Sequence, residues 1–203
     1  MDARQYAPAT QRNREPILEV LLCVLPASGT ILEVASGTGE HAAFLAPRLS
    51  PRQWIPSDPN PQMRLSISAW GEHCPTDNLH PPLDIDACES VWAIEKDNRP
   101  VNAIANINMI HIAPWSACLG LMAGAARLLP AGGILYLYGP FKCGGQHTAP
   151  SNLAFDQALR SQNLEWGVRE LDDVVAAAKA QGLSLLETIQ MPANNLSVVF
   201  GHQ

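Results

Sequence analysis

The sequence has little charge and few aromatic residues, and its cysteines form no closely spaced pair. Charged residues make up 16% of the 203 residues, aromatic residues 6%, and the net charge is −6. A nucleic-acid-binding surface needs clustered basic residues, so we expect no nucleic-acid partner. The five cysteines are far apart and include no CxxC pair, which argues against a disulfide framework and a zinc site. We therefore expect reduced thiols, no metal and a cytoplasmic location.

Long apolar segments of the kind that enter membranes are also missing. The N-terminus has no apolar region typical of a signal peptide. Residues 101–126 carry no formal charge and are long enough to span a bilayer, but they include three asparagines, a histidine and a proline. Those polar groups would be costly in lipid. The segment is better explained as a buried strand, a loop and a helix, and we expect no membrane partner.

Strand and helix patterns alternate along the chain. This alternation predicts an α/β fold, a Rossmann-like three-layer αβα sandwich with a mostly parallel seven-stranded sheet. The last two strands read as a hairpin, which makes the final strand antiparallel. We expect one domain over 1–203, with 1–29 as an N-terminal helix and lid. The expected strands are 30–34, 53–56, 101–107, 134–138, 184–191 and 196–201, with a loop at 75–82 leading into 83–86; the expected helices are 17–25, 40–49, 62–73, 116–129, 152–163 and 172–181, with a loop at 139–152.

A glycine-rich turn between the first strand and the next helix carries the strongest functional signal. The turn is Ser36-Gly37-Thr38-Gly39. Glycine lets the backbone turn tightly and approach a ligand, and the following helix offers unpaired N–H groups. Asp58 comes next, after the second short strand, where its two oxygens can accept both hydroxyls of a ribose. The pattern predicts a nucleotide-type cofactor site.

Glu33 helps to choose between cofactors for this site. Residues 37–42 also satisfy the dinucleotide pattern GxGxxA, so an NAD(P)-dependent oxidoreductase is an alternative. An acid at the strand tip would repel a pyrophosphate, whereas it suits the cationic sulfonium and ammonium of S-adenosylmethionine. We therefore favour S-adenosylmethionine.

The segment from Glu33 to Gly39 resembles motif I of class I S-adenosylmethionine-dependent methyltransferases. More closely, the chain is similar to a widespread methyltransferase-like family of unknown function. The stretches that carry this resemblance are 6–17, 57–59, 106–112, 138–141, 151–156, 166–169 and 191–195.

The resemblance implies cofactor roles for particular positions. Glu33 would lie near the methionine end, the turn of Ser36, Gly37, Thr38 and Gly39 would approach the cofactor, and Asp58 would bind the ribose. Asp84 would contact the adenine amine, although Asp86 or a plain turn competes with it, and Ile85 would pack on the ring. Asn106, at the end of its strand, would face the methyl group.

Catalytic and substrate roles are open to more than one interpretation. His111 follows Asn106 on the catalytic side of the sheet and could be a general base, or a loop histidine bonded to backbone. Asn13 and Arg14 could cover the site or merely lead into the first helix. Tyr138, Phe141 and Asn152 could form a substrate-pocket wall, or belong to a loop packed on its own side chains.

These observations predict a methyltransferase that uses S-adenosylmethionine on a small-molecule substrate. Methyl transfer depends mainly on alignment and exclusion of water, so the lack of an evident catalytic triad does not oppose it. A non-catalytic protein that only binds S-adenosylmethionine is the second alternative. The sequence leaves the substrate and the oligomeric state undetermined.

Overall fold

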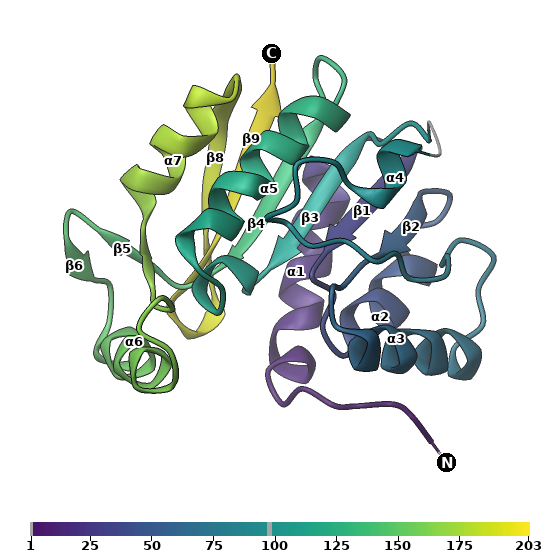
Figure 1. The fold of residues 1–203 in the computed structure, drawn as a ribbon, viewed down its shortest axis with the longest axis horizontal. Helices are drawn as coiled ribbons and strands as arrows, with labels where there is room; N and C mark the ends of the chain where they lie inside the picture. Colours follow the sequence, from purple (N-terminus) through teal and green to yellow (C-terminus); the bar gives the residue numbers. More distant parts are fainter. Residues whose placement is uncertain (1, 97–98) are drawn as a thin grey trace.

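A six-stranded sheet forms the middle layer of the molecule (Figure 1). The structure is a computed structural model that describes residues 2–96 and 99–203; Met1, the first residue of the expected lid, lies outside them. Four neighbouring strands run parallel, and the last two are antiparallel to their neighbours. In spatial order the strands are β2 (Gln53–Pro56), β1 (Thr30–Val34), β3 (Ala103–Ile107), β4 (Ile134–Gly139), β9 (Asn195–His202) and β8 (Leu183–Met191). The predicted Rossmann-like fold with an antiparallel C-terminal hairpin is confirmed.

The predicted count of seven strands is wrong by one. The segment beyond the edge strand β2 makes only two isolated bridges, Trp54 with Leu79 and Ser57 with Leu83. Pro81 and Pro82 lie between these bridges, and proline has no N–H to donate to a ladder. The segment therefore follows β2 without becoming a strand.

Helices cover both faces of the sheet. On one face α1 (Thr10–Val24) and α2 (Glu40–Arg48) share a core with the strands, and on the other α5 (Trp115–Leu128) and α7 (Leu171–Ala180) do so. Side chains of β4 alternate between the two cores, so that Tyr136 and Tyr138 face the α1 side while Leu135 and Leu137 face the α5 side. The remaining helices are α3 (Pro61–His73), α4 (Ala93–Lys96), α6 (Pro150–Gln162) and the 3-10 turns η1 (Met109–His111) and η2 (Pro192–Asn194).

The segment 139–152 is not the continuous loop that its composition predicts. It contains a hairpin of β5 (Phe141–Cys143) and β6 (Gln146–His147), and β5 also pairs with β7 (Arg169–Glu170). Gly144 and Gly145 connect the two strands with φ of 61° and 76°. Two glycines at positive φ match the twist of a tight hairpin, so the Gly-Gly pair was the overlooked signal.

All four parallel strands end at the same edge of the sheet. The loop after β1, the loop after β2, Asn108 after β3 and Pro140 after β4 therefore meet there. This is the edge at which open α/β sheets bind ligands. The sheet topology thus brings the predicted cofactor residues Gly37 and Asp58 together.

Two further searches cover only residues 2–96 and 99–203. No helix among them is both long and apolar enough to cross a membrane. Nor do those residues include a group of three or more His, Cys, Asp or Glu side chains placed to hold a metal ion.

Candidate cofactor and substrate site

The turn after β1 is hydrogen-bonded to the turn after β2. The Ser36 N–H donates to the Ser57 carbonyl over 2.7 Å, and the Ser57 N–H donates to Ser36 Oγ over 3.1 Å. Ala35, Gly37 and Gly39 take φ of 58°, 57° and 88°, which is the left-handed region that favours glycine. The turn is therefore held in one shape by backbone hydrogen bonds.

The two glycines of the turn serve different purposes. A Cβ on Gly39 would come within 2.7 Å of the Ile67 backbone in α3, so this glycine permits close packing. A Cβ on Gly37 would meet no atom within 4 Å, so this glycine borders open space. Gly37 is thus the glycine at which the backbone of the turn borders the cavity.

Asp58 is fixed by two backbone donors. Its Oδ2 accepts from the Gly37 N–H over 3.0 Å, and its Oδ1 accepts from the Asn60 N–H over 2.9 Å. Burial raises the pKa of this carboxyl, and the two N–H groups oppose that shift. Each carboxylate oxygen has more than one acceptor site, so Asp58 can also accept hydrogen bonds from a ligand.

Glu33 is buried at the tip of β1 and is 1% exposed. The Trp54 indole donates to its Oε2 over 3.0 Å. Burial raises the pKa of Glu33 to about 7, while the hydrogen bonds from Trp54 and Ser36 oppose the shift. Glu33 therefore stands near the midpoint of its titration at neutral pH, and a neighbouring cation would favour its charged form.

These groups line a cavity of about 400 Å³ at the strand ends. Its charged or titratable wall residues are Glu33, Asp58 and His41, and burial lowers the pKa of His41 to about 4. The wall residues, all within the described chain, include no lysine or arginine. The full wall is Ala7, Ala9, Thr10, Glu33, Ala35, Ser36, Gly37, Thr38, His41, Asp58, Pro59, Met63, Ile107, Asn108, Met109, Ile112 and Ala113. The cavity is acidic where a dinucleotide site would be neutral or basic.

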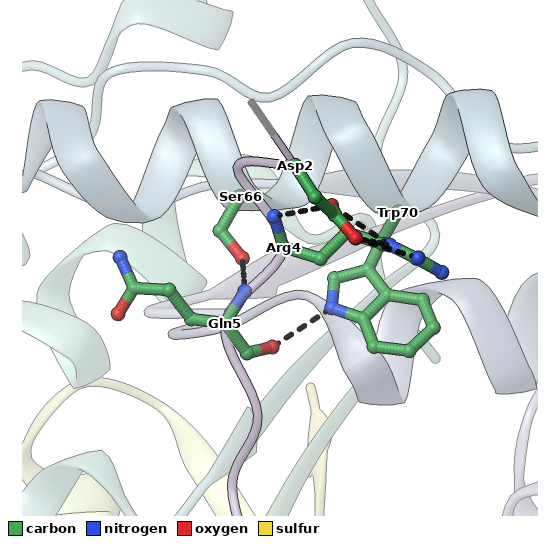
Figure 2. Close-up of polar contacts among 5 residues, drawn as sticks. All are labelled: Asp2, Arg4, Gln5, Ser66 and Trp70. Carbon is green, nitrogen blue, oxygen red and sulfur yellow. Dashed lines mark hydrogen bonds and ion pairs between the residues drawn. The ribbon is translucent and has the colours of Figure 1, made fainter.

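The N-terminal segment borders the cavity at Ala7 and Ala9 and is hydrogen-bonded to α3. Figure 2 shows the Gln5 N–H donating to Ser66 Oγ over 2.8 Å and the Trp70 indole donating to the Gln5 carbonyl over 2.9 Å. Arg4 pairs with Asp2 over 2.7 Å and lies over the Trp70 ring. We call residues 2–9 the N-terminal strap; its motion as a lid stays a prediction.

The strap also reaches the helix that begins the cofactor turn. The Ala7 N–H donates to the Glu40 carboxylate, which also accepts from Thr38 Oγ1 over 3.4 Å. Ala7 and Ala9 of the strap, together with Thr10, therefore form part of the cavity wall.

A second cavity of about 670 Å³ adjoins the first. The two share Ala9, Asn108 and Ile112 as wall residues. The second wall is rich in asparagine and consists of Ala9, Arg12, Asn13, Asn108, Ile112, Tyr138, Pro140, Ser151, Asn152, Phe155, Ala193, Asn194 and Asn195. A ligand in each cavity would meet the other at the shared wall.

Residues 4–202 match the protein family described as "Protein of unknown function (DUF938)". The chain belongs to this family. The predicted likeness to a methyltransferase-like family of unknown function is confirmed.

Several solved structures of methyltransferases have a fold similar to that of this DUF938 protein. An O-methyltransferase family protein from Burkholderia thailandensis matches with a TM-score of 0.79 at 13% identity, over 96% of this chain and 57% of that one. An O-methyltransferase family 2 protein from Planctomyces limnophilus, in complex with apigenin, matches with 0.76 at 20% identity over 96% and 60%. Human N-acetylserotonin methyltransferase, in complex with S-adenosylmethionine, matches with 0.76 at 11% identity over 96% and 52%. The chain spans less than two thirds of each neighbour and shares its class I methyltransferase fold.

Several predicted cofactor residues of this DUF938 protein line the first cavity, namely Glu33, Ser36, Gly37, Thr38 and Asp58. Gly39 lies behind that wall, against Ile67.

Three other predicted cofactor residues do not line either cavity. Asp84 is exposed and pairs with Arg64 over 2.9 Å. Ile85 is buried in the core shared with α5, and Asn106 donates to the Val34 carbonyl over 2.9 Å. Their predicted contacts with adenine and the methyl group stay predictions, and Asn108, two positions after Asn106, lines the cavity instead.

His111, the predicted general base, is fully buried away from both cavity walls. Its carbonyl accepts from the Gly167 N–H, its Nδ1 accepts from the Arg169 N–H over 3.4 Å, and its ring lies edge-on to Phe141 at 5.1 Å. Burial lowers the pKa of His111 to about 3. This arrangement matches the alternative of a histidine bonded to backbone.

Some of the predicted substrate residues line the second cavity and others do not. Asn13, Tyr138 and Asn152 line the second cavity. Phe141 is fully buried against His111, and the Arg14 guanidinium lies over the Phe44 ring at 4.5 Å. Neither of these two side chains reaches a cavity wall.

Sequence reasoning missed several wall residues of the DUF938 site. Asn108 and Ile112 border both cavities, and Asn194 and Asn195 come from the connection between β8 and β9. Both groups fall within stretches that carried the family resemblance, 106–112 and 191–195. A further signal was an asparagine after a buried strand, a residue type that tolerates the left-handed φ of 66° that Asn108 adopts.

Proposed function

We propose that this protein is a methyltransferase that binds S-adenosylmethionine in the first cavity and methylates a small molecule in the second. The acidic, arginine- and lysine-free wall of the first cavity carries the proposal. Such a wall suits a ligand with a sulfonium and an ammonium group, and it disfavours the pyrophosphate of a dinucleotide. The adjoining second cavity gives the methyl acceptor a place to bind.

The residues present fit this cofactor by their chemistry. Asp58 would accept the ribose hydroxyls, Glu33 would lie toward the charged methionine end, and the Gly37 backbone would allow close approach. Pro59 and Met63 offer an apolar side for the adenine ring. S-adenosylmethionine itself supplies the activated methyl carbon when it is bound.

The protein's own contribution would be alignment and exclusion of water. The strap borders the first cavity, and the shared wall at Asn108 and Ile112 sets the approach of the two ligands. Holding two reactants in line can supply much of the rate enhancement of a displacement reaction. His41 is the imidazole on the first wall, and its lowered pKa keeps it neutral at pH 7.

Calorimetric titration with S-adenosylmethionine and S-adenosylhomocysteine tests the proposal. We expect both to bind to the wild-type protein and the Asp58→Asn variant to bind them about 10- to 100-fold more weakly, because hydrogen bonds to a charged group are lost. Asp77→Asn is the matched control, since Asp77 is exposed and borders neither cavity.

The outcomes separate the candidate functions. Absence of heat with either ligand, for a folded wild-type protein, would overturn the proposal. Fluorescence of bound NADH would favour the oxidoreductase. Binding without methyl transfer to any component of a metabolite extract would favour the non-catalytic binding protein.

A further inference from the structure

The Tyr138 hydroxyl in the second cavity has an unusual set of partners. The Asn195 Nδ2 donates to it over 3.0 Å. Asn13 also lines this cavity, and its Oδ1 accepts from His41 Nε2 over 2.8 Å. A phenol oxygen has two lone pairs. Asn195 occupies one of them, and the hydroxyl proton remains free to be donated.

That proton has no acceptor among the described residues. Burial raises the pKa of Tyr138, so the hydroxyl stays protonated at neutral pH. Tyr138 also lines the second cavity. It is therefore a hydrogen-bond donor at the cavity wall that is available to a ligand oxygen.

The asparagines beside Tyr138 have the opposite character. Asn152 donates its two hydrogens to Thr148 Oγ1 and to the Asn194 carbonyl, each over 2.9 Å. Asn195 donates to Tyr138 and to the Pro192 carbonyl over 3.2 Å. With their hydrogens used internally, both side chains offer only their Oδ1 atoms, which accept nothing within the described residues.

The wall also has apolar surface and, among the described residues, a single charged side chain. Ile112, Pro140 and Phe155 provide apolar surface, and Arg12 is the charged residue of the wall. No carboxylate borders the cavity among the residues described. The wall thus disfavours a cationic ligand and favours a neutral or anionic one.

We propose that Tyr138 selects a small hydroxylated carbonyl or carboxylic compound as the methyl acceptor. A carbonyl or carboxylate oxygen of this substrate accepts the Tyr138 proton, and its hydroxyl or N–H group donates to the Oδ1 atoms of Asn152 and Asn195. The assignment of this compound as a methyl acceptor rests on the proposed function. Tyr138 is a specificity-determining residue and takes no part in the chemical step.

The test compares two probes that differ in the oxygen acceptor. One is 4-hydroxybenzoate, and the other is 4-methylphenol, which keeps the ring and the hydroxyl but lacks the carboxylate. Dissociation constants are measured by ligand-observed NMR for the wild type, Tyr138→Phe and Tyr136→Phe. Tyr136 is the matched control because it lies on the same strand and face, is fully buried, bonds Ser197 Oγ over 2.7 Å and borders neither cavity.

The wild type is expected to bind 4-hydroxybenzoate about tenfold more tightly than 4-methylphenol. Tyr138→Phe should reduce that ratio several-fold, although Arg12 still favours the carboxylate, and Tyr136→Phe should preserve it. A general packing defect would weaken both probes equally and leave the ratio intact. An unchanged ratio in Tyr138→Phe, or failure of the wild type to bind or to discriminate, overturns the inference.

A second variant covers the case in which Tyr138→Phe does not fold. In Asn195→Asp the new carboxylate accepts the Tyr138 proton, so the ratio should again fall several-fold. Titration with S-adenosylmethionine runs in parallel on every variant. If S-adenosylmethionine binds but the ratio of probe affinities is unchanged in the variants, only the inference about Tyr138 is wrong. If the second cavity discriminates between the probes but S-adenosylmethionine does not bind, the proposed methyl transfer is wrong.

Discussion

The two cavities meet at one shared wall but are built in different ways. The first depends on backbone, because the turns after β1 and β2 bond to each other and to Asp58. The second depends on side chains that arrive from α1, η1, β4, α6 and the η2 connection. The polar turns of the first cavity thus form a local backbone structure, whereas the second cavity forms only when distant elements pack together.

This difference explains how each cavity can respond to change. Backbone shape is set by glycines and hydrogen bonds that tolerate few substitutions. A side-chain wall can be altered one residue at a time while the fold persists. We therefore expect variants at the first cavity to affect stability and cofactor binding together, and variants at the second to alter selectivity alone.

The largest loss of stability should come from Gly39→Ala, which disrupts the packing of the turn after β1 against α3. The added Cβ would lie 2.7 Å from the Ile67 backbone, at a φ of 88° that disfavours side chains. We expect the free energy of unfolding to fall by about 3 kcal/mol, measured by urea denaturation.

Gly37→Ala is the matched control within the same turn. Its Cβ meets no atom within 4 Å, so only the φ of 57° opposes it, and the loss should be about 1 kcal/mol. Its methyl group enters the first cavity and should weaken S-adenosylmethionine binding. Equal losses of stability in the two variants would show that the turn does not depend on packing against α3.

The same contrast explains what the sequence could predict. Glu33, Gly37 and Asp58 were found because two adjacent strands of a known pattern place them, and all three line the first cavity. The fold followed from alternating patterns, although two prolines removed one expected strand and two glycines added a hairpin. Sequence patterns were therefore sufficient to predict those parts of the structure whose hydrogen bonds join neighbouring strands and turns.

Side-chain orientation was beyond those rules. Asn108, not Asn106, points to the cavities because a left-handed turn follows β3. His111 lies in the correct loop but is held inward by Arg169 and Phe141, which come from distant segments. Position along the chain therefore predicts the edge of the sheet and leaves open which side chain reaches the ligand.

The affinity for S-adenosylmethionine should depend on pH about tenfold, because Glu33 lines the first cavity, whereas no carboxylate among the described residues lines the second. Glu33 has a raised pKa of about 7, so it is mostly protonated at pH 6 and mostly ionised at pH 8. A cationic cofactor prefers the ionised form, and its affinity should therefore rise about tenfold from pH 6 to pH 8. Titration calorimetry across this range measures the change.

Glu33→Gln provides the control for this pH dependence. The amide can still accept from the Trp54 indole but cannot ionise, so affinity should be low and nearly independent of pH. Binding of 4-hydroxybenzoate in the second cavity should be unaffected by the substitution. A wild-type affinity that is flat between pH 6 and pH 8 would contradict the role of Glu33 beside the cofactor charge.

The smallest expected effect concerns the strap, which the Trp70 indole helps to hold against α3 beside the first cavity. Trp70→Phe removes the N–H that donates to the Gln5 carbonyl over 2.9 Å but keeps a ring beside Tyr6, whose centroid lies 5.1 Å away. One partly exposed hydrogen bond contributes about 1 kcal/mol or less, so dissociation of S-adenosylmethionine should accelerate about threefold in stopped-flow measurements. Trp166→Phe is the control, because Trp166 precedes β7 and borders neither cavity. If both variants release the cofactor at the wild-type rate, the strap is a fixed wall of the first cavity, and cofactor exchange must depend on another segment.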